Sequence, residues 1–406
     1  MSLNSTPSGD RVHIGIFGRR NAGKSSLVNA LTGQQLAIVS EVAGTTTDPV
    51  TKAMELLPLG PVVMIDTAGL DDEGELGELR IKKTYQALNR TDIALLAVSA
   101  VDGMSSFDRE LLERIKAKEL PYIVVYTKTD LAPVQKLGDN EAAVSALTGD
   151  GINALKERIA ALSKQEKPQF PIIADKVRAG DVVVLVIPID AAAPKGRLIL
   201  PQQQTIRELL ECGCTTVCCR ETELRGTLVS LAKKPRLVIT DSQAFKGVAA
   251  DTPEDIPLTS FSILFSRHKG DLETQVRGAA ALDSLRDGDR ILISEGCTHH
   301  RQCGDIGTVK LPALLKKYTD KSFNLSFTSG TEFPEDIGDY SLVIHCGGCM
   351  LGEREMKYRI KTACDAGVPI TNYGVALAQM NGILRRSLGI FPETAALLSE
   401  GENRDG

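Results

Sequence analysis

The sequence has no tryptophan, and aromatic residues make up only 4% of its 406 residues. It also has no excess of positive charge, because 47 lysines and arginines stand against 52 aspartates and glutamates, which gives a formal net charge of −5. Nucleic-acid-binding surfaces are usually basic, and single-strand binders also use aromatic side chains. The two shortages therefore argue against a nucleic-acid partner.

Long apolar runs are missing as well. The longest, from Val182 to Ile189, has eight residues, whereas a membrane-spanning helix needs about 20. The first ten residues, MSLNSTPSGD, have neither the basic nor the apolar part of a signal peptide. We therefore predict a cytoplasmic protein with no membrane partner. In a reducing compartment, its nine cysteines are expected to be core residues, reactive thiols or metal ligands rather than disulfides.

What the sequence does contain is an alternation of apolar and polar segments, which predicts an α/β fold with parallel sheets. We predict three domains, at 1–168, 169–262 and 263–406. In the first, strands are expected at 11–17, 62–65, 93–98 and 122–126, and helices at 24–31, 75–89, 106–118 and 152–163. In the second, we expect a buried strand at 181–189, a loop, a short strand and a helix within 194–213, a strand at 238–240 and a linker or loop at 247–258. In the third, strands are expected at 291–294 and 342–344.

A phosphate-binding loop follows the first predicted strand. Residues 18–25 read GRRNAGKS, which matches G-x-x-x-x-G-K-[ST] between a strand and a helix. Lys24 is predicted to bind the β- and γ-phosphates, and the Ser25 hydroxyl is predicted to bind Mg²⁺. Backbone N–H groups around the phosphates complete the predicted contacts, which come from Asn21, Ala22, Gly23, Lys24, Ser25 and Ser26.

Three further motifs identify the nucleotide as GTP. Residues 66–69 read DTAG, so Asp66 can reach Mg²⁺ through water and Gly69 can donate its N–H to the γ-phosphate. Residues 127–130 read TKTD, with Thr where Asn is commoner, and the Asp130 carboxylate can accept hydrogen bonds from guanine N1–H and the exocyclic amine. Adenine has no such donor pair. The remaining predicted guanine contacts come from Thr127, Lys128, Ser145, Ala146 and Leu147. The ordered set resembles the translation-factor-like GTPases.

Two details are similar to the potassium-dependent GTPases of the tRNA-modification (MnmE) type. These are Asn21 in the phosphate loop and the segment 44–48, GTTTD, in the first switch. The resemblance implies that Asn21 and the switch backbone hold K⁺, and that Thr46 binds Mg²⁺, although Thr45 or Thr47 could do so. Lys24, Thr46 and Asp66 are the predicted catalytic residues. Asn21 could instead only stabilise the turn.

A cysteine and histidine pattern follows two strands of the third domain. Cys297 and His299 stand after one strand, and His345, Cys346 and Cys349 stand after the other. Three cysteines with nearby histidines suit either structural zinc, as Cys₃His, or a [4Fe–4S] cluster with one replaceable ligand. The spacing leaves both metals open and favours zinc slightly.

With this pattern, the whole chain resembles the HydF family, the maturation GTPases of [FeFe]-hydrogenase. The resemblance implies that Cys297, Cys346 and Cys349 bind a [4Fe–4S] cluster, with His299 or His345 as a fourth ligand or as a hydrogen-bonding neighbour. It implies a middle dimerisation domain, and hence a homodimer, and a C-terminal cluster domain. It also implies a scaffold role, in which a diiron precursor made by the radical-SAM maturases HydE and HydG is delivered to the apo-hydrogenase.

Other residues receive structural interpretations. We expect Cys212, Cys214, Cys218 and Cys219 to be small buried side chains rather than a second metal site, and Cys364 to lie in a core. Helix 352–362 is expected to present a solvated face, with a partner-binding surface as the alternative. Two alternative functions stay open: an RNA-acting GTPase for tRNA modification or ribosome assembly with a zinc-stabilised accessory domain, and a nucleotide-gated interaction module with a structural metal.

Overall fold

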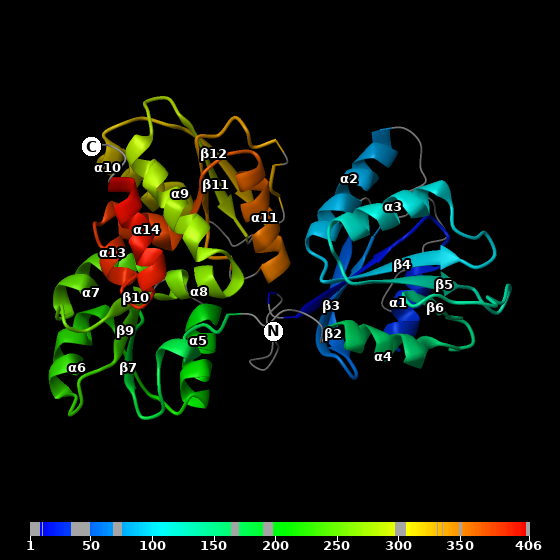
Figure 1. Cartoon of the computed structure of the whole chain (residues 1–406), viewed down its shortest axis with the longest axis horizontal. Helices are drawn as coiled ribbons and strands as arrows, with labels where there is room; N and C mark the ends of the chain where they lie inside the picture. The colour runs from blue at the N-terminus through cyan, green and yellow to red at the C-terminus, as the bar shows by residue number, and fades with distance from the viewer. Residues whose placement is uncertain are drawn as a thin grey trace. The chain divides into compact units, whose positions relative to one another are not determined.

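The chain folds into two compact units, residues 1–168 and 169–406 (Figure 1). This computed structural model describes residues 9, 11–33, 49–67, 75–163, 170–189, 198–296, 306–330, 332–334, 336–348 and 351–402. Within those residues, no helix is both long and apolar enough to cross a bilayer.

The first unit is a six-stranded sheet with helices on both faces. Its strands are β1 (Val12–Phe17), β2 (Val50–Leu56), β3 (Gly60–Asp66), β4 (Ile93–Ser99), β5 (Tyr122–Thr127) and β6 (Glu141–Ala143). Its helices are α1 (Lys24–Thr32), α2 (Glu75–Asn89), α3 (Ser106–Ala117) and α4 (Ile152–Ser163). The sheet order is β2-β3-β1-β4-β5-β6, and all neighbouring strands run parallel except β2 and β3. The four strands and four helices predicted for this unit are confirmed.

The two faces of this sheet bury different helices (Figure 1). Leu27 of α1 and Leu155 of α4 belong to one hydrophobic cluster, whereas Leu88 of α2 and Leu111 of α3 belong to the other. Central strands of such a sheet are apolar on both sides, and every residue of β4 is buried. The edge strand β2 escaped prediction because it is mostly exposed or half-buried, so its sequence lacks an apolar run.

The second unit contains two parallel four-stranded sheets. One has the order β10-β9-β7-β8 and the other β12-β11-β13-β14. The strands are β7 (Val182–Val186), β8 (Thr215–Cys219), β9 (Leu237–Thr240), β10 (Leu258–Ser260), β11 (Arg290–Glu295), β12 (Asn324–Ser329), β13 (Leu342–His345) and β14 (Ile370–Asn372). The helices are α5 (Leu200–Glu211), α6 (Leu224–Ser230), α7 (Phe245–Asp251), α8 (Phe261–Lys269), α9 (Leu272–Ser284), α10 (Leu311–Thr319), α11 (Glu353–Asp365), α12 (Tyr373–Met380), α13 (Leu384–Ser387) and α14 (Pro392–Glu402).

One hydrophobic core joins these two sheets. It contains Leu185 of β7 and Ile293 of β11, together with residues of α8, α9 and α12. The boundary that we predict at 262/263 therefore falls inside α8 and within a shared core. The expected linker at 247–258 is wrong over its first half, because α7 occupies Phe245–Asp251 and buries Val248 against β7 and β9. The small residues at the start of this segment predicted a loop, but in the structure they form one face of α7.

Candidate functional site

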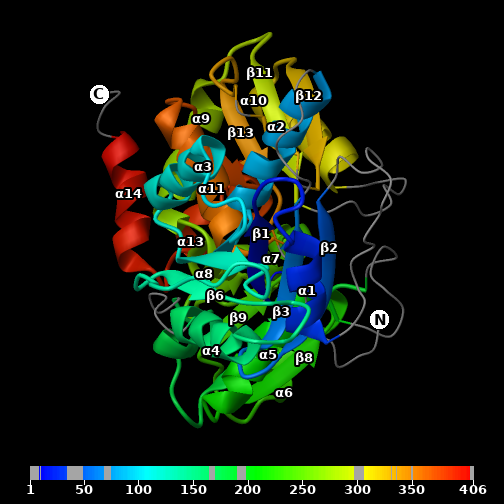
Figure 2. The same ribbon diagram turned by 90° about the vertical axis from the view of Figure 1, so that its right-hand side faces the viewer.

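The phosphate loop leads from β1 into α1 (Figure 2). Gly18 has a φ of 141°, and a side chain there would collide with the carbonyl oxygen of Ala97. Gly23 caps α1 in the left-handed conformation and makes no side-chain capping bond. Gly23 has no side chain that could cap the first N–H groups of α1, and a phosphate group can take that place. Asn21 is exposed and also has a positive φ, 57°, which Asn tolerates better than most residues.

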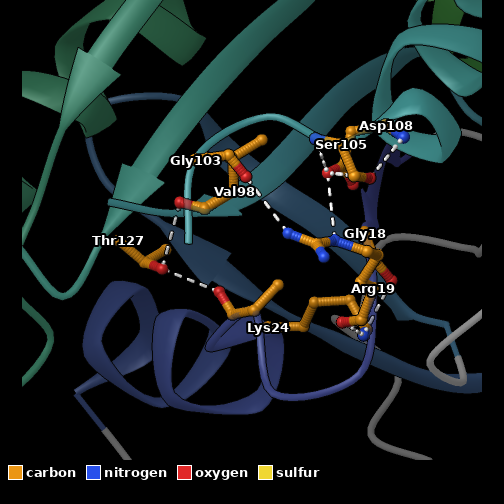
Figure 3. Close-up of polar contacts among 9 residues, drawn as sticks. Gly18, Arg19, Lys24, Val98, Gly103, Ser105, Asp108 and Thr127 are labelled. Carbon is orange, nitrogen blue, oxygen red and sulfur yellow. Dashed lines mark hydrogen bonds and ion pairs between the residues drawn. The ribbon is translucent and has the colours of Figure 1, made fainter. Parts of the chain in front are cut away.

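Lys24 is buried, and its side chain runs back toward Gly18 and Arg19 of the loop (Figure 3). Its Nζ atom donates hydrogen bonds to the carbonyl oxygens of Gly18, at 2.9 Å, and of Arg19, at 2.7 Å. The ammonium group is therefore held at the mouth of the loop, among the backbone groups expected to bind phosphate.

Ser25 and Asp66 lie together where a Mg²⁺ ion is expected. The Ser25 hydroxyl donates to Asp66 Oδ2 at 3.0 Å. Asp66 Oδ1 is buried and has no hydrogen-bond partner within the part of the chain that the structure describes. Burial raises the pKa of this carboxyl group, and Ser25 and Lys24 oppose that rise. An orphaned carboxylate oxygen beside a hydroxyl group fits a hydrated Mg²⁺. Two other predicted contacts, Thr46 and Gly69, lie outside the described residues.

Thr127 joins the guanine motif to the phosphate loop (Figure 3). Its hydroxyl group lies 2.7 Å from the carbonyl oxygen of Ala22 and 3.3 Å from that of Val98. The side chain is buried, directly beneath Gly23. A threonine at this position therefore ties the loop to the end of β5, a role that the sequence motif alone did not reveal.

The two guanine motifs meet at Asp130. Asp130 is exposed, and its Oδ1 accepts a hydrogen bond from the buried Ser145 hydroxyl at 2.7 Å. Lys128 has a positive φ of 57°. Ala146 is half-buried, and Leu147 is 85% exposed. The structure thus brings the 127–130 and 145–147 segments together around one carboxylate.

A clamp on the phosphate loop was missed by the sequence analysis. Arg19 Nε donates to Asp108 Oδ2 at 3.1 Å, and its Nη2 donates to the carbonyl oxygen of Gly103 at 3.1 Å (Figure 3). Asp108 is buried and forms a capping box with Ser105 at the start of α3. The spacing of Ser105 and Asp108 is a capping-box signal, but nothing in it points to Arg19.

The predicted metal ligands begin with Cys346, which follows β13. Its Sγ atom accepts hydrogen bonds from the backbone N–H groups of Gly296, at 3.0 Å, and Gly348, at 3.4 Å. These glycines immediately precede Cys297 and Cys349 in the sequence. Backbone donors aimed at sulfur favour a thiolate and tune iron–sulfur centres, so this sulfur fits a metal ligand.

The remaining members of the cysteine motif are only partly covered. Cys297, His299 and Cys349 lie outside the described residues. Among the residues that are described, no group of three metal-binding side chains comes together. Of the predicted ligands, the structure therefore places His345 and Cys346.

His345 is buried and hydrogen-bonded on both ring nitrogens. Nδ1 lies 2.6 Å from the carbonyl oxygen of Cys346, and Nε2 lies 2.9 Å from Arg359 Nη1. Burial, reinforced by the charge of Arg359, lowers the pKa of His345 to about 3. The imidazole is therefore neutral.

Arg359 corrects our interpretation of the charged helix. We expected 352–362 to be a solvated face, but Arg359 is 0% exposed and Glu355 is 4% exposed. The two residues form a buried ion pair at 2.8 Å. The charged sequence of this helix predicted exposure wrongly, because Arg359 and Glu355 neutralise each other's charge inside the fold.

The structural cysteines are corrected in part. Cys214 is buried as expected, but Cys212 and Cys219 are half-buried and Cys218 is exposed. Cys218 lies on the edge strand β8, between Val217 and Cys219, which pack against a hydrophobic core from the opposite face of the sheet. Cys364 lies on α11 but is exposed rather than part of a core.

Three family models match successive parts of the chain. Residues 13–128 match a family model described as 50S ribosome-binding GTPase. Residues 172–270 match the hydrogen maturase F dimerization domain, and residues 273–390 match the hydrogen maturase F tetramerization domain. The two maturase models together cover more than half of the 406 residues.

Curated relatives match the first unit. The tRNA modification GTPase MnmE of Chromobacterium violaceum is 38% identical over 154 residues, which are 36% of this chain and 34% of that protein. MnmE of Paraburkholderia xenovorans is 39% identical over 153 residues, 36% of this chain and 32% of that protein. The chain thus spans about a third of the length of these relatives. Among solved structures, Era of Aquifex aeolicus bound to GDP·AlF4⁻ is 21% identical, with a TM-score of 0.35, over 51% of this chain and 93% of that one.

Proposed function

The chain belongs to the hydrogen maturase F family, and from that premise we propose that it is a GTP-hydrolysing iron–sulfur scaffold that delivers a diiron precursor to apo-[FeFe]-hydrogenase. The observation that carries the proposal concerns the Cys346 sulfur. It accepts hydrogen bonds from two backbone N–H groups at the edge of a parallel sheet where the carboxyl ends of its strands lie. Ligand sites of open α/β sheets lie at this edge. A GTPase domain precedes it in the same chain.

GTP hydrolysis uses the phosphate loop of the first unit. Lys24 and the N-terminus of α1 neutralise charge on the phosphates and orient the γ-phosphate for attack by water. Mg²⁺, when held by Ser25, Thr46 and, through water, Asp66, supplies further positive charge. Asp130 and the 145–147 segment select guanine. Asn21 and the backbone of 44–48 hold a K⁺ ion near the phosphates, as the resemblance to MnmE suggests.

The cluster site uses three cysteines. Cys297, Cys346 and Cys349 would hold a [4Fe–4S] cluster through their thiolates, which would leave one iron for an exchangeable ligand. That iron is where the diiron cargo or its carrier group would attach. The radical-SAM maturases HydE and HydG are the proposed donors of the cargo.

The matches to dimerization and tetramerization domains support an oligomer, and we propose that the middle domain forms a homodimer. We place the assembly in the cytoplasm, where thiols stay reduced and the maturation partners can meet it.

A second function remains as a rival. The MnmE relatives match the GTPase domain well, and an RNA-acting GTPase with a zinc-stabilised accessory domain would share it. The acidic composition works against this rival.

An activation assay decides between these functions. The full chain is loaded anaerobically with cluster and precursor and then added to apo-[FeFe]-hydrogenase, and hydrogen evolution is measured. Activation by the wild type that is lost in Cys346→Ser and kept in Cys364→Ser would support the scaffold. Tight, GTP-dependent binding of tRNA or ribosomal RNA, with no activation, would favour the rival.

A further inference from the structure

One buried arginine connects the ends of three strands around the cysteine site. Arg359 of α11 donates from Nη1 to Ser294 Oγ at 3.2 Å, at the end of β11. Its Nη2 donates to the carbonyl oxygen of Gly330, directly after β12, at 2.9 Å. Nη1 also lies 2.9 Å from Nε2 of His345, the last residue of β13. A fully buried guanidinium with this many partners fixes its surroundings.

The hydrogen bonds fix the tautomer of His345. A carbonyl oxygen can only accept, so the ring nitrogen 2.6 Å from the Cys346 carbonyl, Nδ1, must carry the proton. A guanidinium can only donate, so Nε2 must accept from Arg359. The lone pair of Nε2 is therefore already engaged, and Nδ1 has none to offer.

The same residue fixes the backbone of the neighbouring ligand. His345 holds the carbonyl group of Cys346, while the sulfur of Cys346 turns toward the N–H groups of Gly296 and Gly348. The chain Arg359–His345–Cys346 thus separates two tasks at adjacent residues: the cysteine presents its sulfur, and the histidine anchors the main chain.

We propose that Arg359 is a positioning residue that engages His345 Nε2 and so keeps this histidine from ligating iron. The one iron that has no cysteine ligand then stays open to an exchangeable ligand. This inference rests on the proposed cluster. Glu355 keeps the arginine in place, because its carboxylate pairs with Nε and Nη2 in the buried helix face.

The test uses the full chain reconstituted with iron and sulfide and reduced with dithionite. Pulsed EPR reports nitrogen bound to the cluster, and His345→Gln identifies any coupling from His345. The key variant is the double substitution Arg359→Met with Glu355→Met, because replacing both members of a buried pair avoids leaving a lone charge. Lys357→Met, at an exposed position of the same helix, is the matched control.

We expect no coupling between the cluster and a His345 nitrogen in the wild type or in Lys357→Met. We expect a new nitrogen coupling in the double variant, which disappears when His345→Gln is added. A wild-type coupling that His345→Gln removes would overturn the inference, and so would a double variant that retains its cluster without any new coupling.

A second measurement does not depend on the cluster. In the apo full chain labelled with ¹⁵N-histidine, NMR reports which imidazole nitrogen carries the proton, and His345→Gln assigns the signal. The inference expects a fixed Nδ1–H tautomer at neutral pH. An Nε2–H tautomer, or exchange between the two, would overturn it. If the wild type bound no cluster at all, the proposed function would fail while this measurement still tested the contact between Arg359 and His345.

Discussion

The nucleotide site and the cysteine site each lie at the carboxyl ends of the strands of their own sheet, but they place their positive charge differently. Each places a glycine-containing loop after a central strand, β1 in one case and β13 in the other. The first loop ends at the N-terminus of α1, and in the second site two backbone N–H groups donate to the Cys346 sulfur. In the first, the cation Lys24 stands at the mouth of the loop. In the second, the cation Arg359 is buried behind the loop and is paired with Glu355.

The difference fits the ligands that we propose for the two sites, GTP for the first and a metal cluster for the second. A nucleoside triphosphate brings several negative charges that are spread over many contacts, so its site distributes binding over many groups. A metal cluster is held by a few covalent ligands, so its site needs those ligands to be held in place. Single substitutions should therefore give graded losses at the nucleotide site and nearly complete loss at the cysteine site.

The largest effect is expected for Cys346→Ser. Because a hydroxyl group is a poor substitute for a thiolate ligand of iron, iron retained after anaerobic reconstitution and desalting should fall to background. Iron is measured by a colorimetric assay on the full chain. Cys364→Ser, at an exposed position outside the motif, should retain the wild-type iron content. Equal iron content in both variants would refute the claim that the cysteine site depends on Cys346.

Lys24→Ala should slow GTP hydrolysis by about 10²–10³-fold, because it removes a preorganised positive charge from the phosphates. Phosphate release at saturating GTP measures the loss. Lys136→Ala, which changes an exposed lysine of the same unit, should hydrolyse GTP at the wild-type rate. A loss below about threefold would show that Lys24 does not act on the phosphates.

Asp130→Asn should weaken GTP binding by about 30-fold, or about 2 kcal/mol, the usual contribution of hydrogen bonds to a charged group. An amide can donate to a carbonyl at position 2 of the base, so binding of xanthosine triphosphate should improve. Competition binding with a fluorescent nucleotide measures both. Asp139→Asn, at an exposed site, serves as the control, and unchanged preference for GTP in Asp130→Asn would refute the guanine contact.

The smallest effect is expected for Thr127→Val, which keeps the shape of the side chain but leaves the carbonyl oxygen of Ala22 without its hydroxyl partner. The loss of about 1 kcal/mol predicts about fivefold weaker nucleotide binding. Thr127→Ser retains the hydroxyl and should stay near the wild type. If Thr127→Ser weakened binding as much as Thr127→Val, packing rather than the hydrogen bond would link the two motifs.

How much of each site the sequence predicts depends on how far apart in the sequence its contacting residues lie. The phosphate loop is local: eight consecutive residues specify its shape, so the strand, the loop and the start of α1 were all predictable. The contacts that hold it, from Thr127 to Ala22 and from Arg19 to Asp108, span 105 and 89 residues, and no local pattern announces them.

The cysteine site shows the same limit more strongly. The C-x-H and H-C-x-x-C spacing identified candidate ligands, but Arg359 lies 14 residues after His345 and 65 after Ser294. In the sequence it sits among charged neighbours, which favour an exposed helix face. Only the fold, which brings Arg359 to Ser294 at the end of β11 and to His345 at the end of β13, shows that this arginine is buried.

The most direct test of the whole account is low-temperature EPR of the full chain, purified and reconstituted without oxygen and reduced with dithionite, with metal content measured on the same sample. The account predicts about four iron atoms per chain and the signal of a reduced [4Fe–4S] cluster. Stoichiometric zinc with no cluster signal would contradict it.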